Sequence, residues 1–421
     1  MIRNTVTLGA IAALNVAMGF AFIVYTVAAL GPGRLTDAFF AGMVIPQLIS
    51  AIGVASLGNV VTPILANQSE EIGRAHAWQL SAVVAGVCVA LSLLLALLAP
   101  LWVPLTVPGF DAAGVGLTVE LARIHLFATV FTAEATLLVA AQNARHRFLW
   151  AELSGPVAGA LSFALLIWAL PRWGVHGVAW AWVVKPVIQA ALLLPQLGRY
   201  RAERSEPALL STLWLRLKPL LLGSTYYKLD IVVDRVLVSL APLGNLTLLY
   251  LAQQTYSSAA TVLSRGVANP AMPVLANLAR DGRWEDYRCY VRRRMWVALA
   301  LTAAPLAIFS VAGEPALMNS LAGGRFSAQD ASMLWLLLMA LGGQWIGGGV
   351  GAVTTVAYYA RGDTLTPTRL GVITFTFYLP LKVWAFFAWG TVGLAVTTSL
   401  FFLANAVLQV LLLNRGPHAH T

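Results

Sequence analysis

Charged residues and cysteines are both scarce in this chain, and each shortage excludes a class of protein. Of the 421 residues only 10% are charged and 59% are hydrophobic, and the mean hydropathy is +0.77. This composition excludes an ordinary water-soluble domain. The two cysteines, Cys88 in an apolar stretch and Cys289 beside basic residues, lack the spacing of a disulfide framework or a metal site. We therefore expect no redox chemistry.

Catalytic motifs are also missing. The sequence has no Gly-x-x-x-x-Gly-Lys-Ser/Thr nucleotide loop and no His-Glu-x-x-His metal pair, and its six histidines are scattered. A membrane enzyme, such as a glycan polymerase or an acyltransferase, remains an alternative without a motif to support it. We expect a protein that is not an enzyme and that has no cofactor and no metal.

Long apolar runs are abundant, and they follow one another with short polar breaks. Each is long enough to cross a hydrocarbon core of about 30 Å as a helix. They predict an all-α polytopic membrane protein with about twelve transmembrane helices, at 5–30, 37–66, 77–106, 117–142, 149–170, 174–198, 208–240, 245–279, 289–313, 328–360, 367–389 and 391–414.

Basic residues are distributed unevenly between the two sides of these spans. With the N-terminus in the cytoplasm, eighteen lysines and arginines fall on the inner side and three on the outer side. This asymmetry obeys the positive-inside rule and explains most of the net charge of +10. We therefore expect a multi-pass protein of the bacterial cytoplasmic (inner) membrane with both termini in the cytoplasm, and no nucleic-acid partner.

An internal repeat divides the chain. At an offset of 210 residues, Leu30-Gly31-Pro32 matches Leu240-Ala241-Pro242, and at an offset of 216, Trp173-Gly174 matches Trp389-Gly390. The repeat predicts an N-terminal six-helix lobe at 1–200 and a C-terminal six-helix lobe at 201–421, parallel in direction and joined by the polar segment 199–207. Transporters built in this way hold their substrate between the halves. The alternative is that duplication reflects only the ease of building a helical bundle.

Three segments resemble the MurJ (MviN) lipid II flippases, within the superfamily of multidrug, oligosaccharidyl-lipid and polysaccharide exporters. They are Thr36–Phe40 with the following Ile45-Pro46 and Pro63, the loop Asn143–Phe148, and the loop Tyr358–Pro367, which is the most specific. The resemblance implies a V-shaped bundle of two lobes, as in the MurJ and MATE proteins.

The implied function is to flip a polyprenyl-diphosphate-linked sugar intermediate from the cytoplasmic to the outer leaflet by alternating access. Lipid II and an exopolysaccharide or O-antigen repeat unit are both candidates, for cell wall or polysaccharide biosynthesis. The expected partners are this lipid-linked glycan and membrane lipids, and we expect a monomer. The alternative is a multidrug or cation antiporter of the same superfamily, which would prefer a cavity rich in carboxylates.

Two departures from the lipid II branch of the family concern the choice of glycan. That branch usually has two further C-terminal helices, and it has cavity arginines where this sequence has Val16, Phe22, Ser50 and Gln254. The sequence therefore leaves lipid II and other polyprenyl-linked glycans open as substrates.

Ionisable residues inside the predicted spans are the candidate site residues, because each costs about 2.5–3.5 kcal/mol to insert. Lys185, Lys228, Arg235 and Arg265 are the predicted substrate-binding cations for a diphosphate. For Arg265 an ion pair or snorkelling toward the inner face is an equal alternative. Glu134 lies deep enough in its predicted span to form an ion pair with Lys185.

A second group concerns energy coupling. The family resemblance implies a sodium-binding carboxylate or its polar substitute at Asp234, and Lys382 takes a matching place in the eleventh span. We expect the Lys382 ammonium to replace a bound cation, with Thr397 or Thr398 nearby. The pair is either a static lock between helices or a protonation switch, and coupling to the membrane potential or to an H⁺ or Na⁺ gradient stays open. The glycines at 342–351 predict close helix packing or a hinge.

Overall fold

The computed structural model describes residues 2–198 and 207–414, and throughout these residues the regular structure is helical, apart from one isolated bridge between Gly323 and Phe326. Two compact units divide the chain, residues 1–246 and 247–421. The predicted all-α class is confirmed. The predicted lobe boundary and all of the predicted linker 199–207 except Pro207 lie outside the described residues, so the division at 200 stays a prediction.

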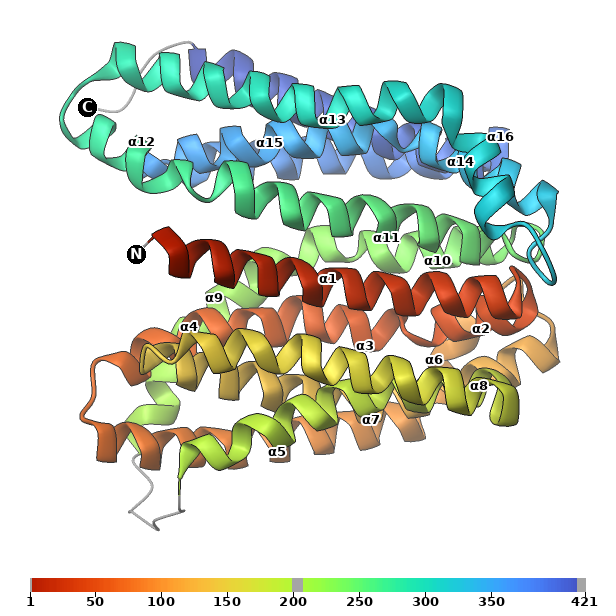
Figure 1. Ribbon diagram of the computed structural model, residues 1–421, viewed down its shortest axis with the longest axis horizontal. Coiled ribbons are helices and arrows are strands. Elements are labelled where there is room, and N and C mark those ends of the chain that lie inside the picture. The colour runs from red at the N-terminus through yellow and green to blue at the C-terminus, as the bar shows by residue number, and fades with distance from the viewer. Residues whose placement is uncertain (1, 199–206, 415–421) are drawn as a thin grey trace. The chain divides into compact units, whose positions relative to one another are not determined.

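Unit 1 is built from helices that pack along their lengths (Figure 1). They are α1 (Ile2–Leu30), α2 (Arg34–Gly42), α3 (Val44–Ile49), the π-helix η1 (Ser50–Val54), α4 (Ala55–Ala66), α5 (Glu70–Leu97), α6 (Ala99–Thr106), α7 (Ala112–Ala144), α8 (Phe148–Leu193), the 3₁₀ turn η2 (Leu194–Leu197), α9 (Pro207–Lys228) and α10 (Asp230–Ser239). Helix α7 packs against α2, α4, α5 and α8, so it is the centre of the unit.

Unit 2 begins within the first turn of α11 and is helical throughout its described part. Its elements are α11 (Asn245–Leu263), the π-helix η3 (Ser264–Ala268), α12 (Ala271–Arg280), α13 (Trp284–Leu321), α14 (Ala328–Ala340), α15 (Gly342–Ala360) and α16 (Leu365–Asn414). Helix α15 is the central helix here, because it packs against α12, α13 and α16.

Eight helical segments of the described chain are long and apolar enough to cross a membrane. Two of them, 148–197 and 365–413, each cover two of the predicted spans. The predicted spans 208–240 and 245–279 are helical as α9–α10 and α11–α12, although they are not among the eight. The polytopic architecture thus follows the apolar runs of the sequence.

The two longest helices each contain a glycine that reverses the chain. Gly174 in α8 has φ 54° and Gly390 in α16 has φ 62°, values that favour glycine. Shortly after each break another glycine allows the returning helix to approach. A Cβ at Gly177 would lie 2.6 Å from the carbonyl oxygen of Ala169. In unit 2, a Cβ at Gly393 would lie still closer to the carbonyl oxygen of Ala385. The 216-residue repeat is therefore conserved in backbone geometry.

Tryptophan pairs mark the same two hairpins. Trp168 and Trp173 meet edge to face with ring centroids 5.2 Å apart, and Trp384 and Trp389 meet in the same way at 5.1 Å. All four side chains are exposed. Because tryptophan prefers the boundary between headgroups and acyl chains, these pairs indicate where the two hairpins leave the membrane.

The end of α10 and the turn that follows it are held within unit 1 by two hydrogen bonds between a backbone amide and a side chain. Buried Asp37, in the first turn of α2, accepts a hydrogen bond from the Gly244 amide at 2.6 Å. The Gly109 amide donates to Ser239 Oγ at 3.3 Å. Asp37 therefore does more than complement the positive end of its own helix, because it also fixes a segment 207 residues away.

Candidate functional site

A pocket of about 470 Å³ lies in unit 2 around the π-helix η3. It is enclosed by α11, η3, α15 and α16, and its lining consists of Tyr256, Ser257, Ala260, Thr261, Ser264, Arg265, Asn269, Gln344, Trp345, Gly348 and Phe402. A π-turn inserts one extra residue into a helical turn and is frequent at functional sites. Here it carries Arg265, a predicted substrate-binding cation, into the pocket wall.

Two aromatic residues form a rigid wall of this pocket. Tyr256 and Trp345 stack with ring centroids 5.8 Å apart and an interplanar angle of 18°. The Tyr256 hydroxyl donates to the Leu338 carbonyl at 2.7 Å, and Trp345 Nε1 donates to the Thr302 carbonyl at 2.9 Å. Since both polar ends are tied to backbone, the ring planes are fixed before any ligand binds.

Six of the other nine lining residues are polar, and one of these six is a cation. Among the lining residues Arg265 is the charged side chain, and no carboxylate is present in this lining. Gln344 Oε1 is buried and accepts no hydrogen bond from any residue that the structure describes. A guanidinium, amides, hydroxyls and aromatic faces together suit a ligand that combines phosphate with sugar hydroxyls.

Sequence reasoning found Arg265 but missed its neighbours. Tyr256 and Trp345 are 89 residues apart in the sequence, so no local pattern joins them. One signal was available, because Ser257, Thr261 and Arg265 recur at every fourth residue and so share one face of a helix.

Lys185 lies in the second half of α8, facing α1 in unit 1. Its ammonium makes no hydrogen bond or ion pair with any residue in the described part of the chain. Two glycines leave room for it, since a Cβ at Gly19 would lie 3.8 Å from Nζ and one at Gly159 would lie 3.9 Å from Cε. Nearby on α1, Asn15 Oδ1 is buried and lacks a hydrogen-bond partner among the described residues.

Glu134 belongs to a different contact. Its Oε2 accepts a hydrogen bond from Ser81 Oγ at 2.6 Å, which joins α7 to α5. The structure therefore gives this carboxyl group a hydroxyl partner on α5, and no ion pair with Lys185 is formed in unit 1.

The remaining predicted residues of unit 1 cluster around the break between α9 and α10. Lys228 is the last residue of α9 and is half-buried, whereas Asp234 and Arg235 in α10 are 4% and 2% exposed. Asp234 and Lys382 belong to different units. Their predicted ion pair stays a prediction.

Lys382 is fully buried in the first half of α16. Its Nζ lies 4.8 Å from the ring centroid of Tyr378, one turn earlier, and the Tyr378 hydroxyl lies 2.9 Å from Thr398 Oγ1 on the returning half of the helix. Thr397 donates to the Gly393 carbonyl at 2.7 Å. Tyr378, a residue that sequence reasoning missed, thus contacts both Lys382 and Thr398.

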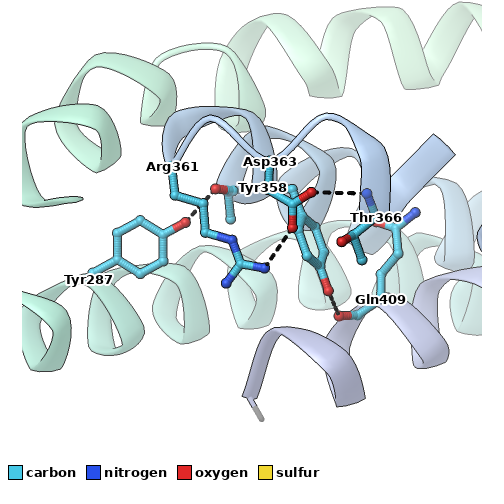
Figure 2. A network of polar contacts seen from close by, with 7 residues as sticks. Tyr287, Tyr358, Arg361, Asp363, Thr366 and Gln409 are labelled. Carbon is cyan, nitrogen blue, oxygen red and sulfur yellow. Dashed lines mark hydrogen bonds and ion pairs between the residues drawn. The ribbon is translucent and has the colours of Figure 1, made fainter. Parts of the chain in front are cut away.

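The loop after α15 is held by a polar network (Figure 2). The Arg361 guanidinium lies 3.2 Å from Asp363 Oδ2, and Asp363 Oδ1 accepts from the Thr366 amide at 2.9 Å. The Tyr358 hydroxyl donates to the Gln409 carbonyl at 2.8 Å, and the Tyr287 hydroxyl donates to the Ala357 carbonyl. This loop therefore fixes the ends of α13, α15 and α16 relative to one another.

Electrostatics make Asp363 a permanent anion at neutral pH. Burial alone would raise the pKa of this carboxyl group, but the hydrogen bonds from Thr366 and the charge of Arg361 outweigh burial and lower the pKa below its ordinary value of 3.8. Arg361 also lies over the Tyr358 ring, 4.5 Å from its centroid. The loop is thus a structural clamp between the ends of α13, α15 and α16.

Comparison with known proteins gives consistent matches over most of the chain. A family model described as lipid II flippase MurJ matches residues 26–420. A probable lipid II flippase MurJ of Bdellovibrio bacteriovorus is 25% identical over 408 residues, covering 92% of this chain and 77% of that protein. A probable lipid II flippase MurJ of Rhizobium tropici is 24% identical over 442 residues, covering 99% and 81%.

Solved structures show the same fold. The chain is similar to lipid II flippase MurJ in an inward closed conformation, with a TM-score of 0.84 and 16% identity over 97% of this chain and 87% of that one. It is also similar to an inward-facing multidrug resistance MATE family transporter, with a TM-score of 0.75 and 14% identity over 97% and 94%.

Proposed function

The chain belongs to the lipid II flippase MurJ family, and from this premise we propose that it moves a polyprenyl-diphosphate-linked sugar intermediate from the cytoplasmic to the outer leaflet, with lipid II as the first candidate. A flippase moves its lipid without making or breaking a covalent bond, so the chain is a multi-pass membrane transporter and not an enzyme.

The Arg265 pocket is the observation that carries the choice of substrate class. A diphosphate needs cationic donors, and arginine binds phosphate oxygens through two parallel N–H bonds. The fixed Tyr256–Trp345 wall and the unsatisfied Gln344 oxygen suit sugar rings and their hydroxyls. A multidrug or cation antiporter, the alternative function, would be better served by a carboxylate in this lining.

Lys185 provides a second cation for the same substrate class. Its ammonium is half-buried in unit 1 beside two glycines, and no acidic residue of the described chain neutralises it. A lysine held in this way in a membrane protein marks a binding site or an ion pathway. We assign Lys185 to an anionic part of the substrate, and Lys228 and Arg235 to the same role at the α9–α10 break.

Lipid II is the first candidate substrate because the similar proteins of Bdellovibrio and Rhizobium are named as probable lipid II flippases. Phe22, at one place where the family resemblance implies a cavity arginine, is buried and packs edge to face on Trp182 at 5.4 Å. An exopolysaccharide or O-antigen repeat unit therefore remains the second candidate, since it shares the polyprenyl diphosphate and differs in the sugars.

The remaining parts of the proposal concern the setting of the protein. It works as a monomer in the bacterial cytoplasmic membrane with both termini in the cytoplasm, and it needs neither a cofactor nor nucleic acid. The basic excess on one side of the spans supports this orientation.

Coupling is assigned to Asp234 and Lys382, with Thr397 and Thr398 beside the lysine. Both charged side chains are buried inside membrane helices, a placement that marks ion pathways. An Asp234→Asn variant in proteoliposomes should lose the dependence of transport on a proton gradient if the carboxylate is a protonation switch. Undiminished gradient dependence would exclude the switch and leave the static lock.

Depletion of the resident flippase in a bacterial host tests the substrate. Expression of this chain should prevent the accumulation of lipid II, whereas an Arg265→Gln variant at equal membrane abundance should not, and Arg265→Lys should restore part of the activity. Arg325→Gln, which removes an exposed arginine outside the pocket, is the matched control. An unchanged lipid II pool with the unaltered chain would reject lipid II as the substrate, and clearance of another lipid-linked intermediate would identify that glycan instead.

A further inference from the structure

A groove of about 730 Å³ runs along α13 in unit 2, away from the Arg265 pocket. Helix α13 supplies most of its wall, and α15 and the end of α16 close it. The lining residues are Glu285, Tyr287, Arg288, Cys289, Val291, Arg292, Met295, Trp296, Leu299, Val350, Val410 and Leu413. The groove shares no lining residue with the Arg265 pocket, and its one residue in common with the Arg361 clamp is Tyr287, whose hydroxyl donates to the Ala357 carbonyl.

The chemistry of the groove changes along its length. Glu285, Arg288 and Arg292 lie toward the first turns of α13, whereas Trp296 and Leu299 follow further along the same helix. From Arg288 to Leu299 the helix rises about 16 Å. That distance spans a phosphate headgroup, a glycerol and the upper part of an acyl chain. The groove is thus charged at one end and apolar at the other.

The two arginines of the groove remain available for a ligand, whereas two neighbouring arginines have partners within the protein. Arg283 is paired with Asp286 at 2.8 Å, and Arg294 stacks on Tyr290 with 5.1 Å to the ring centroid. Arg288 and Arg292 make no ion pair or hydrogen bond within residues 2–198 and 207–414.

Acidic residues do not cancel this charge. Glu285 is the carboxylate of the lining, so two guanidinium groups face one anion at the mouth of the groove. This end of α13 also lies on the side that the positive-inside rule assigns to the cytoplasm. Anionic phospholipids are concentrated in that leaflet, and basic pockets between transmembrane helices bind their headgroups.

We propose that this groove binds an anionic glycerophospholipid of the cytoplasmic leaflet, with its phosphate on Arg288 and Arg292 and one acyl chain along Trp296, Leu299 and Val350. A free phosphate would satisfy the arginines and leave the apolar half empty. An uncharged or zwitterionic lipid would fill the apolar half and leave a net positive charge at the mouth. An anionic lipid satisfies both ends of the groove.

Thermal stabilisation of the purified full chain in detergent tests this site. Dioleoyl phosphatidylglycerol should raise the apparent melting temperature, whereas dioleoyl phosphatidylcholine and water-soluble glycerol phosphate should not at the same concentration. An Arg292→Gln variant should need at least about tenfold more phosphatidylglycerol for half the effect, because a charge-assisted contact is lost. Arg293→Gln removes the same charge one residue away, where the side chain is exposed outside the groove, and should match the unaltered chain.

Cys289 provides a second readout inside the groove. Its side chain is exposed and lines the groove, and in a Cys88→Ser background it is the single thiol of the chain. Phosphatidylglycerol should slow its reaction with a maleimide several-fold, and Arg292→Gln should abolish this protection. Equal protection by phosphatidylcholine, equal stabilisation by glycerol phosphate, or equal loss in Arg293→Gln would overturn the proposal.

Discussion

Gly347 in α15 provides the sharpest test of how unit 2 is packed. A Cβ placed there would lie 2.6 Å from both the carbonyl carbon and the carbonyl oxygen of Phe402, and 2.7 Å from the Leu403 amide nitrogen. All three atoms belong to the backbone of α16, so no side-chain rotation relieves the clash. Gly351, one turn further along α15, has no atom within 4 Å of its added Cβ. Gly347→Ala and Gly351→Ala therefore form a matched pair.

The two substitutions are expected to change the free energy of unfolding in opposite directions. Both substitutions remove the conformational freedom of a helical glycine, worth about 0.8–1 kcal/mol in favour of alanine. At Gly347 the two helices must also separate by about 1 Å to restore ordinary contact distances near 3.5 Å, and overpacking of this kind costs about 1–3 kcal/mol. At about 2–4 °C per kcal/mol for a unit of 150–250 residues, Gly347→Ala should melt roughly 2–12 °C below Gly351→Ala.

The assay is the apparent melting temperature of each purified variant in the same detergent, with transport measured in parallel. Melting temperatures that agree within error would refute the packing argument. A stable Gly351→Ala protein that no longer transports would instead show that this part of α15 is a hinge, because the added methyl group has space and only backbone freedom is lost.

Three further substitutions should give separate signatures. Gln409→Leu removes the buried amide oxygen that accepts from Thr354 at 2.6 Å, so the free energy of unfolding should fall by about 1–3 kcal/mol, and an unchanged melting temperature would contradict this. Asp363→Asn should remove the part of the acid-dependent stability that Asp363 supplies. Because the folded-state pKa of Asp363 lies below 3.8, its contribution is full above that value and disappears as the pH falls through the lower pKa, so stability measured from pH 7 to pH 3 should show a smaller acid loss in the variant. Asp37→Ala leaves the Gly244 amide without its acceptor at 2.6 Å and should accelerate hydrogen exchange at residues 241–246, whereas exchange at the unaltered rate would argue that the contact is dispensable.

Local sequence signals were sufficient for the elements of this fold. Uninterrupted apolar runs predicted the spans and the breaks between them, and the structure reverses the chain at two of these breaks through the repeat-matched glycines Gly174 and Gly390. Asp111 and Ser327, also 216 residues apart, cap α7 and α14 through the same side-chain hydrogen bond to a backbone amide. Such features depend on residues within one or two turns.

Contacts between distant segments could not be predicted in the same way. The aromatic wall of the Arg265 pocket joins Tyr256 to Trp345, and Asp37 holds Gly244 across 207 residues. The π-turn at Ser264–Ala268 has no sequence signature either, although it sets which way Arg265 faces. Periodicity assigns a residue to a face of its own helix, and it does not identify the helix opposite.

Comparison of the two repeats shows which charged residues are present in one repeat and absent from the other. At the offset of 216 residues, Lys185 corresponds to Phe401 and Lys382 to Leu166, and at 210 Arg265 corresponds to Ala55. Phe401 stacks on Tyr378 at 4.6 Å, and Leu166 is fully buried, so the partner positions of the two lysines are filled by ordinary apolar packing, whereas Ala55 is exposed. A structural requirement common to both repeats would have kept the charge in both, as it kept the capping residues and the paired glycines. Each of these cations is therefore required in one repeat only. This pattern is expected when a symmetric scaffold binds an asymmetric lipid whose phosphates and sugars differ along its length.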